Sequence, residues 1–531
     1  MRTRAGAVLA FLAAFFVLSL LHLPLLGLPY FWDEAGYYVP AALDFYHSGL
    51  LIPSLTSPAG HPPLISVYLG IAWRFCGYDP LITRLAMTLI ATTTIATLYK
   101  LGRRVANPEV AAWSIILLAL SPLFFAQSTL VHLDLAAALF TTLAIYFLLE
   151  DRFWLFALAA SLAVLSKETA VVLMPVAWLY TWHITRSSTG GWRNSFWRWS
   201  ALATPLVPLV AWTVYYHHAT GFWTGNREYL RYNLYSTLSA TRIFWSLLRR
   251  LYELLFSGFN WLLTVGALVG FWRSRRRKGN PAVVAEKPLW RAVTLCVHHE
   301  SRVGTPALQF MFLAAGLGLI YLLLLSVVGG AVLPRYLLPI LPCFYLIAVT
   351  MVTRLPRFPA RLICTTAAAC FVGAWFINPP YPFPFEDNLA YADYIRLHQQ
   401  AAQCLESMPG DPRILTAWPA TDEIERPFLG YVRKPLRPVP VQGFTPQEFA
   451  NVPEQSFDIL YLYTRKWEPP GNWVARFPEW LQMQARYFDY RPQINAEDLV
   501  ARYHLQLREQ FERRGQWVRI YSRRKAEGSR Q

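Results

Sequence analysis

Apolar runs close to the length of a membrane-spanning helix dominate the first 377 residues of the chain. A helix needs about 20 mostly apolar residues to cross a bilayer, and somewhat fewer where the bilayer thins, and about eleven runs meet this requirement. They lie at residues 7–28, 80–102, 109–125, 132–149, 153–166, 168–183, 199–219, 254–272, 307–327, 336–353 and 360–377. We therefore expect a mainly α-helical polytopic membrane protein with about eleven transmembrane helices.

The composition excludes soluble, fibrous and disordered chains. Hydrophobic residues make up 55% of the 531 residues and charged residues only 15%, which is unlike a soluble multidomain protein. Six scattered cysteines in so long a chain do not form the framework of a disulfide-stapled module. The net charge of +17 resembles that of a nucleic-acid-binding protein. However, the basic residues lie at the ends of apolar runs instead of on one soluble face, so we expect no nucleic-acid partner.

The basic residues also predict the orientation of the chain. Cytoplasmic loops of membrane proteins carry an excess of Lys and Arg. If the amino terminus is cytoplasmic, the basic loops that fall on the same side are 100–104, 186–198, 273–278 and 354–361. Eleven crossings then place everything after residue 378 outside a bacterial plasma membrane. The first run is expected to be an anchor and not a signal peptide, because no small-residue cleavage site follows it before Pro29.

Two domains are predicted. Residues 1–377 would form the transmembrane domain, with a long first outer loop at 29–79, and residues 378–531 a soluble extracytoplasmic α/β domain. The expected helices of the second domain lie at 388–405 and 496–513, and its expected strands at 413–417, 458–463 and 517–521. It contains no Gly-rich phosphate loop, so we assign it no nucleotide.

Acidic residues are rare in the membrane domain and gather toward its outer face. Asp33 and Glu34 come directly after the first run, and Asp134 lies at the outer mouth of the fourth. An aspartate toward the centre of a membrane helix costs about 2.5–3.5 kcal/mol, so such residues usually have a function. The alternatives are solvated loop charge for the Asp33–Glu34 pair and a helix cap for Asp134.

Short motifs in the membrane domain carry a family resemblance. In chain order they are Trp32-Asp33-Glu34-Ala35, His61-Pro62-Pro63-Leu64, His132-Leu133-Asp134, Ser166-Lys167-Glu168-Thr169 and Leu333-Pro334-Arg335-Tyr336-Leu337-Leu338-Pro339. Together they resemble polyprenyl-phosphate-sugar-dependent glycosyltransferases of the GT-C type, the group that contains protein O-mannosyltransferases and lipid A aminoarabinose transferases. The resemblance implies an enzyme that moves a hexosyl or pentosyl group from a polyprenyl-phosphate carrier, with inversion, to an acceptor hydroxyl or phosphate on a protein, lipid or envelope glycan.

The resemblance also implies roles for the acidic residues. Asp33 would be the general base, or the carboxylate that orients the acceptor, and Glu34 would orient or bind. Asp134 would be a second carboxylate that holds sugar hydroxyls or the acceptor. The chain departs from some lipid A transferases at Gly60 and His61, where those enzymes carry an acidic and a basic residue. No cofactor is firmly implied, and a divalent metal stays an open alternative.

The leaving phosphate requires positive charge on the outer side. Arg335 beside Tyr336, Lys167 and His61 are the candidates, and Arg335 is the strongest because its planar fork matches phosphate oxygens. Alternatively, Arg335 would be an interfacial anchor whose charge reaches the headgroups, and Lys167 would simply pair with Glu168.

Other features leave room for other functions. Basic and aromatic residues alternate at 217–233, which suits either a lipid headgroup or an ordinary interfacial belt. A transporter or a flippase of envelope precursors would also show many spans and rare carboxylates. It would place its charges near the midplane and show internal repeats, neither of which we find in this sequence.

Overall fold

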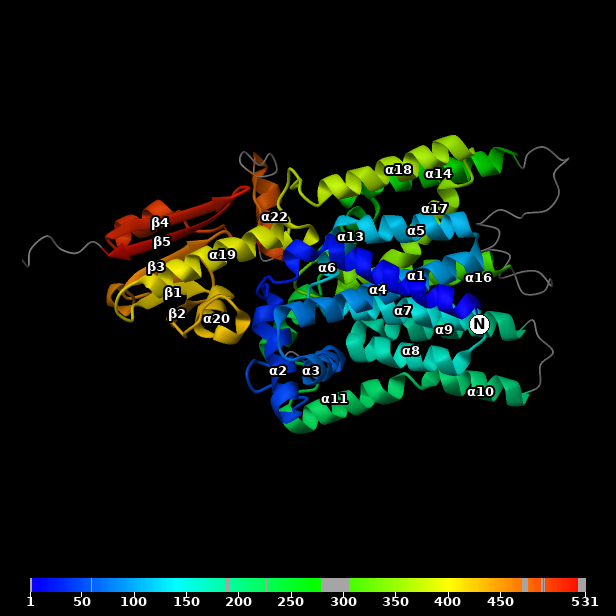
Figure 1. The fold of residues 1–531 in the computed structure, drawn as a ribbon, viewed down its shortest axis with the longest axis horizontal. Helices are drawn as coiled ribbons and strands as arrows, with labels where there is room; N and C mark the ends of the chain where they lie inside the picture. Colours follow the sequence, from blue (N-terminus) through cyan, green and yellow to red (C-terminus); the bar gives the residue numbers. More distant parts are fainter. Residues whose placement is uncertain are drawn as a thin grey trace, which may run out of the picture.

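Helices make up most of the protein, and a small sheet lies at one end. The computed structural model describes residues 2–58, 60–186, 192–225, 227–277, 305–469, 476–488, 490 and 492–523. Parts of the expected basic loops, at 187–191 and 278, and Asn226 of the basic and aromatic segment lie outside these residues. Figure 1 shows long helices lying nearly parallel, with the sheet and its helices beyond the end of the bundle that is remote from the amino terminus.

The bundle follows most of the predicted apolar runs. Its helices are α1 (Arg2–Leu21), α4 (Pro80–Val105), α5 (Pro108–Leu120), α6 (Pro122–Gln127), α7 (Leu133–Leu149), α8 (Phe153–Ser166), α9 (Leu173–Arg186), α10 (Trp192–Ala203), α11 (Leu206–Thr220), α13 (Ala240–Leu255), α14 (Asn260–Arg277), α16 (Pro306–Val327), α17 (Leu341–Val352) and α18 (Arg357–Ala374). Some expected runs are divided. The run at 168–183, for example, is the 3-10 helix η3 (Glu168–Val172) followed by α9.

Two helices of the bundle begin at a proline that follows a capping side chain. Proline fits the first turn of a helix because its missing N–H is not needed there. Asp79 accepts a hydrogen bond from the Leu81 N–H (2.7 Å) at the start of α4, and Asn107 accepts one from the Val110 N–H (2.9 Å) at the start of α5. These caps define where two neighbouring helices start.

The bundle is apolar both inside and on its surface. Among the described residues, three helices are long and apolar enough to cross a membrane: Pro80–Val105, Pro306–Val327 and Pro334–Val352. A fourth is counted if the bent pair Ala240–Leu255 and Ser257–Arg276 forms one span, and shorter apolar helices surround them. Large apolar side chains are exposed on the outside of the bundle, among them Leu9, Phe16, Val207, Trp272, Leu319 and Phe358. Such a surface requires an apolar surrounding, as expected for a membrane protein.

The first outer loop contains helices that the sequence did not predict. One turn of π-helix, η2 (Glu34–Tyr38), leads into α2 (Val39–Ser48), and α3 (Leu64–Cys76) follows. Figure 1 shows α2 and α3 at the end of the bundle that faces the sheet. They pack against each other with α3 crossing close to α2, because Gly70 leaves no Cβ where the Phe45 ring lies.

The C-terminal part contains a five-stranded sheet with strand order β2-β1-β3-β5-β4. Its strands are β1 (Arg413–Ala417), β2 (Arg437–Val441), β3 (Ile459–Tyr463), β4 (Leu505–Arg513) and β5 (Gln516–Arg523). β1 pairs in parallel with β2 and β3, and β5 pairs antiparallel with β3 and β4. Helix α19 (Ala390–Ser407) carries the chain from the bundle to this sheet.

The expected helix at 496–513 is wrong in its second half. Helix α23 (Ala496–Arg502) ends at Arg502, and β4 then forms a hairpin with β5. His504 has a left-handed φ of 50°, which ends the helix, and Arg514 and Gly515 have φ values of 46° and 80° at the hairpin turn. Two consecutive residues with positive φ make the kind of turn that suits the twist of paired strands. Pairing with β5 therefore overrides the helical pattern of the charged residues.

Candidate functional site

One buried arginine gathers carboxylates from distant segments. Arg335, in the 3-10 helix η6 (Pro334–Ile340), is 3% exposed. Its Nη2 donates to Asp33 Oδ2, and its Nη1 donates to Glu386 Oε2 at 2.8 Å. The same Nη1 lies 2.7 Å from His132 Nε2, and Asp134 Oδ2 lies 3.8 Å from its Nε. This side chain therefore does not reach for the lipid headgroups. It forms the centre of an ionic cluster.

Asp33 is the most accessible of these carboxylates. Its side chain is 20% exposed, against 3% for Asp134 and 6% for Glu386. The preceding Trp32 has a φ of 44°, a left-handed conformation that non-glycine residues seldom adopt. The chain thus turns sharply just before Asp33, which occupies the position that leads into η2. An incoming molecule could reach Asp33 more easily than either of the other two acids.

In Glu34, by contrast, both carboxylate oxygens are engaged in hydrogen bonds within the protein. It is fully buried, and both of its oxygens accept hydrogen bonds from Arg84. Its oxygens also accept from the Phe31 N–H (2.7 Å) and from the Val131 N–H. This buried pair ties the first outer loop to the segment that precedes α7. Glu34 thereby fixes the position of its neighbour Asp33.

Asp134 and Lys167 form the second ion pair of the site. Lys167 Nζ donates to Asp134 Oδ1 at 2.6 Å, and both side chains are buried. Asp134 is the second residue of α7. The capping position belongs to His132, whose side chain makes no capping hydrogen bond. Glu168 pairs instead with His61, whose Nδ1 lies 3.0 Å from Glu168 Oε2. His61 therefore does not contact the ionic cluster itself but Glu168, the residue that follows Lys167.

Three cations surround the ring of Tyr336. Lys167 Nζ lies 3.9 Å from the ring centroid, and the guanidinium carbons of Arg250 and Arg335 lie 5.4 and 5.6 Å from it. Cations within about 6 Å of an aromatic face are attracted by the electrons of the ring. The Tyr336 ring therefore supports a concentration of positive charge beside the carboxylates.

Arg250 in α13 is a site residue that the sequence did not reveal. It is fully buried, and its Nη1 donates to the Leu333 carbonyl at 2.6 Å. Its Nε and Nη2 have no hydrogen-bond partner among the described residues, and neither has Nε of Arg335. Buried N–H groups are almost always paired, so these donors are available to an acceptor from outside the described chain. Its signal in the sequence was weak, because α13 mixes charged and apolar residues and did not register as an apolar run.

Glu386 is the second residue that the sequence left without a role. It belongs to the short helix η7 (Phe385–Asp387), between the bundle and α19, and is 4% exposed. Burial raises its pKa to about 7, although the positive charge of Arg335 acts in the opposite direction. The sequence Glu386-Asp387-Asn388 drew attention to this segment, but nothing in it indicated contact with a residue of η6.

No metal centre is evident in the part of the chain that the structure describes. No three side chains of His, Cys, Asp or Glu gather there in a way that could hold a metal ion. The acids of the cluster are instead neutralised by Arg335 and Lys167. The described part of the basic and aromatic segment contacts the first outer loop, because the rings of His61 and Tyr229 meet edge to face with their centroids 5.8 Å apart. Within the segment, His217 stacks on Trp223.

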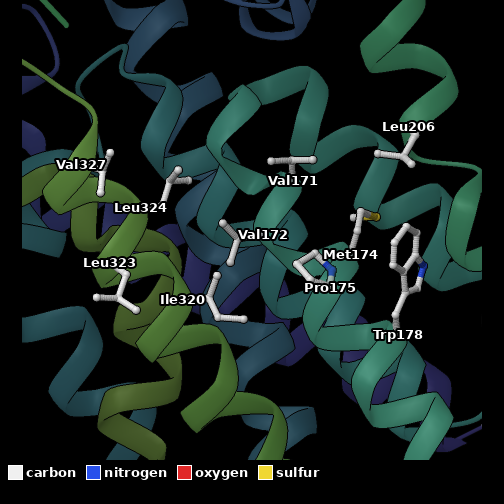
Figure 2. A pocket seen from close by; sticks show the side chains of 10 residues that line it. All are labelled: Val171, Val172, Met174, Pro175, Trp178, Leu206, Ile320, Leu323, Leu324 and Val327. Carbon is white, nitrogen blue, oxygen red and sulfur yellow. The ribbon is translucent and has the colours of Figure 1, made fainter. Parts of the chain in front are cut away.

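An apolar pocket of about 610 Å³ opens between η3, α9 and α16. Figure 2 shows that its side chains come from η3 and α9 on one side and from α16 on the other, with Leu206 of α11 at one edge. Val171 and Val172 in its wall follow Lys167 by only a few residues. A short stretch of chain therefore connects the wall of the pocket to Lys167, one of the cations around Tyr336.

Comparison with known proteins identifies related folds. A family model described as dolichyl-phosphate-mannose-protein mannosyltransferase matches residues 60–216, a segment that contains His61, Asp134 and Lys167. Among solved structures, ArnT from Cupriavidus metallidurans in the apo state has a TM-score of 0.54 and 15% sequence identity, and the match covers 98% of each chain. The same protein bound to undecaprenyl phosphate gives a TM-score of 0.54 and 14% identity, covering 97% of this chain and 98% of that one.

A more distant match is the archaeal oligosaccharyltransferase AglB from Archaeoglobus fulgidus, in complex with an inhibitory peptide and a dolichol-phosphate. Its TM-score is 0.47 and its identity 11%, covering 86% of this chain and 69% of that one. No curated protein matches the chain by sequence. The family-model match and the ArnT-like fold confirm the predicted resemblance to the GT-C glycosyltransferases.

Proposed function

We propose that this protein is an inverting glycosyltransferase that moves a sugar from a polyprenyl-phosphate carrier to an acceptor at the outer face of a bacterial plasma membrane. One observation carries the proposal: unpaired, buried N–H groups of Arg250 and Arg335 lie around Tyr336, beside a carboxylate cluster that includes the accessible Asp33. An anion-binding centre next to a base is what transfer from a phosphate carrier requires.

Asp33 acts in this proposal as the general base. The acceptor oxygen attacks the anomeric carbon of the sugar from the face opposite the phosphate, while Asp33 takes the proton of the acceptor. The bond between the anomeric carbon and the phosphate oxygen breaks, and the phosphate leaves with the electron pair. Asp134 holds the acceptor or a sugar hydroxyl, and Glu34 keeps Asp33 in place.

The leaving phosphate is held by Lys167 and Arg250, together with the Nε of Arg335, around the Tyr336 ring. Preorganised donors in a site that excludes water stabilise developing negative charge without having to reorient. Arg335 gives its two terminal nitrogens to Asp33 and Glu386, so it contributes less to the phosphate than Arg250 does. His61 lies beside these residues through its contact with Glu168, the residue that follows Lys167.

The isoprenoid tail of the carrier occupies the apolar pocket between α9 and α16 (Figure 2). Its walls are mostly aliphatic, with Met174 and the ring of Trp178 completing them, which suits a branched hydrocarbon chain. Lys167 lies just before η3, whose residues Val171 and Val172 enter the wall. One carrier could therefore place its phosphate near Lys167 and its tail in the pocket.

The proposal is tested with purified protein in detergent or nanodiscs and a set of radiolabelled undecaprenyl-phosphate hexoses and pentoses. Envelope extracts from a deletion strain serve as the acceptor. We expect release of undecaprenyl phosphate together with labelled acceptor for one of these sugars. A transporter or flippase would move the labelled carrier across proteoliposomes with the sugar–phosphate bond intact, and that result would contradict the proposal.

We predict that the amino terminus is cytoplasmic and that the chain after residue 378 is extracytoplasmic. The alternation of basic loops supports this orientation, as does the amino terminus lying at the end of the bundle remote from the sheet (Figure 1). Reporter fusions at Gln531 and in the loop at 273–278 should report opposite sides. If both report the cytoplasm, the number of spans differs by one from the eleven proposed.

A further inference from the structure

The segment between the bundle and the sheet delivers a carboxylate that the reaction described above does not use. The Glu386 backbone carbonyl accepts a hydrogen bond from Gln127 Nε2 at 3.1 Å, at the end of α6. Phe385 beside it is buried and packs against Tyr394 of α19, with ring centroids 5.8 Å apart. Contacts to the bundle and to α19 thus hold Glu386 firmly in its position.

One oxygen of Glu386 is engaged and the other is not. Oε2 accepts from Arg335 Nη1 at 2.8 Å. Oε1 is buried and has no hydrogen-bond partner among the described residues, and the same is true of Oδ1 of the adjacent Asp387. A buried oxygen without a donor is costly and rare in folded proteins, so an outside donor is expected to complete it.

The charge of the cluster indicates what kind of donor this is. Among the described residues, the Lys and Arg partners that Asp33, Asp134 and Glu386 share are Arg335 and Lys167, and His132 Nε2 lies 3.7 Å from Glu386 Oε2. An anion such as the carrier phosphate would be repelled by the free oxygen of Glu386. A neutral group with O–H donors is not repelled, and a carboxylate binds hydroxyl groups through strong charge-assisted hydrogen bonds.

We propose that Glu386 forms a subsite for a hydroxyl group of the transferred sugar, with Oε1 as the acceptor. The inference rests on the proposed function, because it assigns the sugar of the carrier to this position. Arg335 holds Oε2 of Glu386, and Oε1 accepts a hydrogen bond from the sugar hydroxyl. Glu386 thus selects the sugar, whereas Lys167 and Arg250 bind the phosphate that every carrier shares.

The test compares two probes that differ only in the sugar. Binding of undecaprenyl phosphate and of undecaprenyl-phosphate mannose is measured by isothermal calorimetry in nanodiscs, for wild type and Glu386→Gln. We expect the variant to bind the sugar-bearing probe about 10- to 100-fold more weakly, the loss typical of one hydrogen bond to a charged group, and the sugar-free probe almost as wild type does. If mannose is not the sugar, the arabinose-bearing carrier is the second probe.

The controls separate this role from a structural one. Glu423 in α20 (Ala420–Glu425) is as buried as Glu386, but its oxygens accept from Tyr394 and contact His398, so Glu423→Gln should change neither affinity. Glu386→Asp keeps the charge with a shorter reach and should show the same selective loss if Glu386→Gln unfolds. Equal losses for the two probes would mean that Glu386 only positions Arg335, and this would overturn the subsite.

Failure of the proposed function gives a different result. A wild-type protein that binds neither probe would refute the carrier, and with it the subsite. A wild-type protein that binds both probes with equal affinity, and whose Glu386→Gln variant does the same, would retain the carrier and refute the subsite alone.

Discussion

Asp33→Asn is expected to reduce sugar transfer by about 10²–10⁴-fold and to leave the fold intact, because the loss of a positioned general base typically has this effect. Asparagine keeps the shape of the side chain, and its amide oxygen can still accept the hydrogen bond from Arg335. What it lacks is the basicity needed to take the proton of the acceptor. Carrier affinity should change little, since the proposal assigns the phosphate to Lys167, Arg250 and the Nε of Arg335, and not to Asp33. The measurement is turnover with labelled carrier, together with carrier binding at matched protein levels.

The matched control for Asp33→Asn is Asp44→Asn. Asp44 lies in the same outer loop and is buried, but its oxygens hold Ser54 and the Leu55 N–H and do not contact the ionic cluster. This control should lose some stability and keep its turnover per folded molecule. Near-normal turnover in a well-folded Asp33→Asn protein would instead assign the base to Asp134.

Most of the helical framework could be predicted from the sequence, because a membrane helix is recognisable as a long run of apolar residues. The runs at 80–102, 132–149, 153–166 and 307–327 correspond closely to α4, α7, α8 and α16. Helices that mix charged and apolar residues escaped prediction. α13 was missed because it buries Arg250 and Glu253 within a pattern that reads as amphipathic. The strand β4 was missed because its ladder partner β5 overrides a local helical pattern.

The candidate site was predicted as a set of residues but not as a geometry. The motifs singled out Asp33, Asp134, Lys167 and Arg335, and these four side chains lie in direct or neighbouring contact. Arg250 and Glu386 could not be found in this way. Their roles depend on contacts between segments far apart in the chain, and on donors and an acceptor left unpaired after folding. Periodicity and motif spacing carry no information about such contacts.

The sequence likewise did not determine which acidic residue pairs with which basic residue. Lys167 and Glu168 are adjacent in sequence, and an ion pair between them was a reasonable alternative. The chain passes from α8 into η3 at this point, and Lys167 has an extended conformation (φ −154°). Lys167 pairs with Asp134, and Glu168 pairs with His61 of the first outer loop. The two adjacent residues therefore contact different segments of the chain.

Arg335→Lys is expected to lower turnover by about 10²–10³-fold although the positive charge is kept, the size of loss seen when one preorganised donor is removed from a transition state. The guanidinium of Arg335 contacts Asp33 and Glu386 with separate nitrogens, and its Nε faces Asp134. A lysine has one nitrogen at the end of a flexible stem and cannot hold three carboxylates in fixed directions. Asp33 would then lose the orientation that the proposed role as base requires.

The wider effects of this substitution separate a structural hub from an interfacial anchor. An anchor needs only a long stem with a positive end, so Arg335→Lys would then keep nearly full activity. Arg335→Ala goes further, because it leaves Asp33 and Glu386 without their cation, and we expect it to lower the free energy of unfolding by about 3–5 kcal/mol. Arg242→Lys is the matched control: Arg242 is equally buried, but within the part of the chain that the structure describes it donates to the backbone carbonyls of Tyr487, Gly329 and Gly330 and to no carboxylate. If Arg335→Lys and Arg242→Lys lose equally little turnover, Arg335 does not organise the site, and the orientation of Asp33 must come from Glu34 and Arg84 alone.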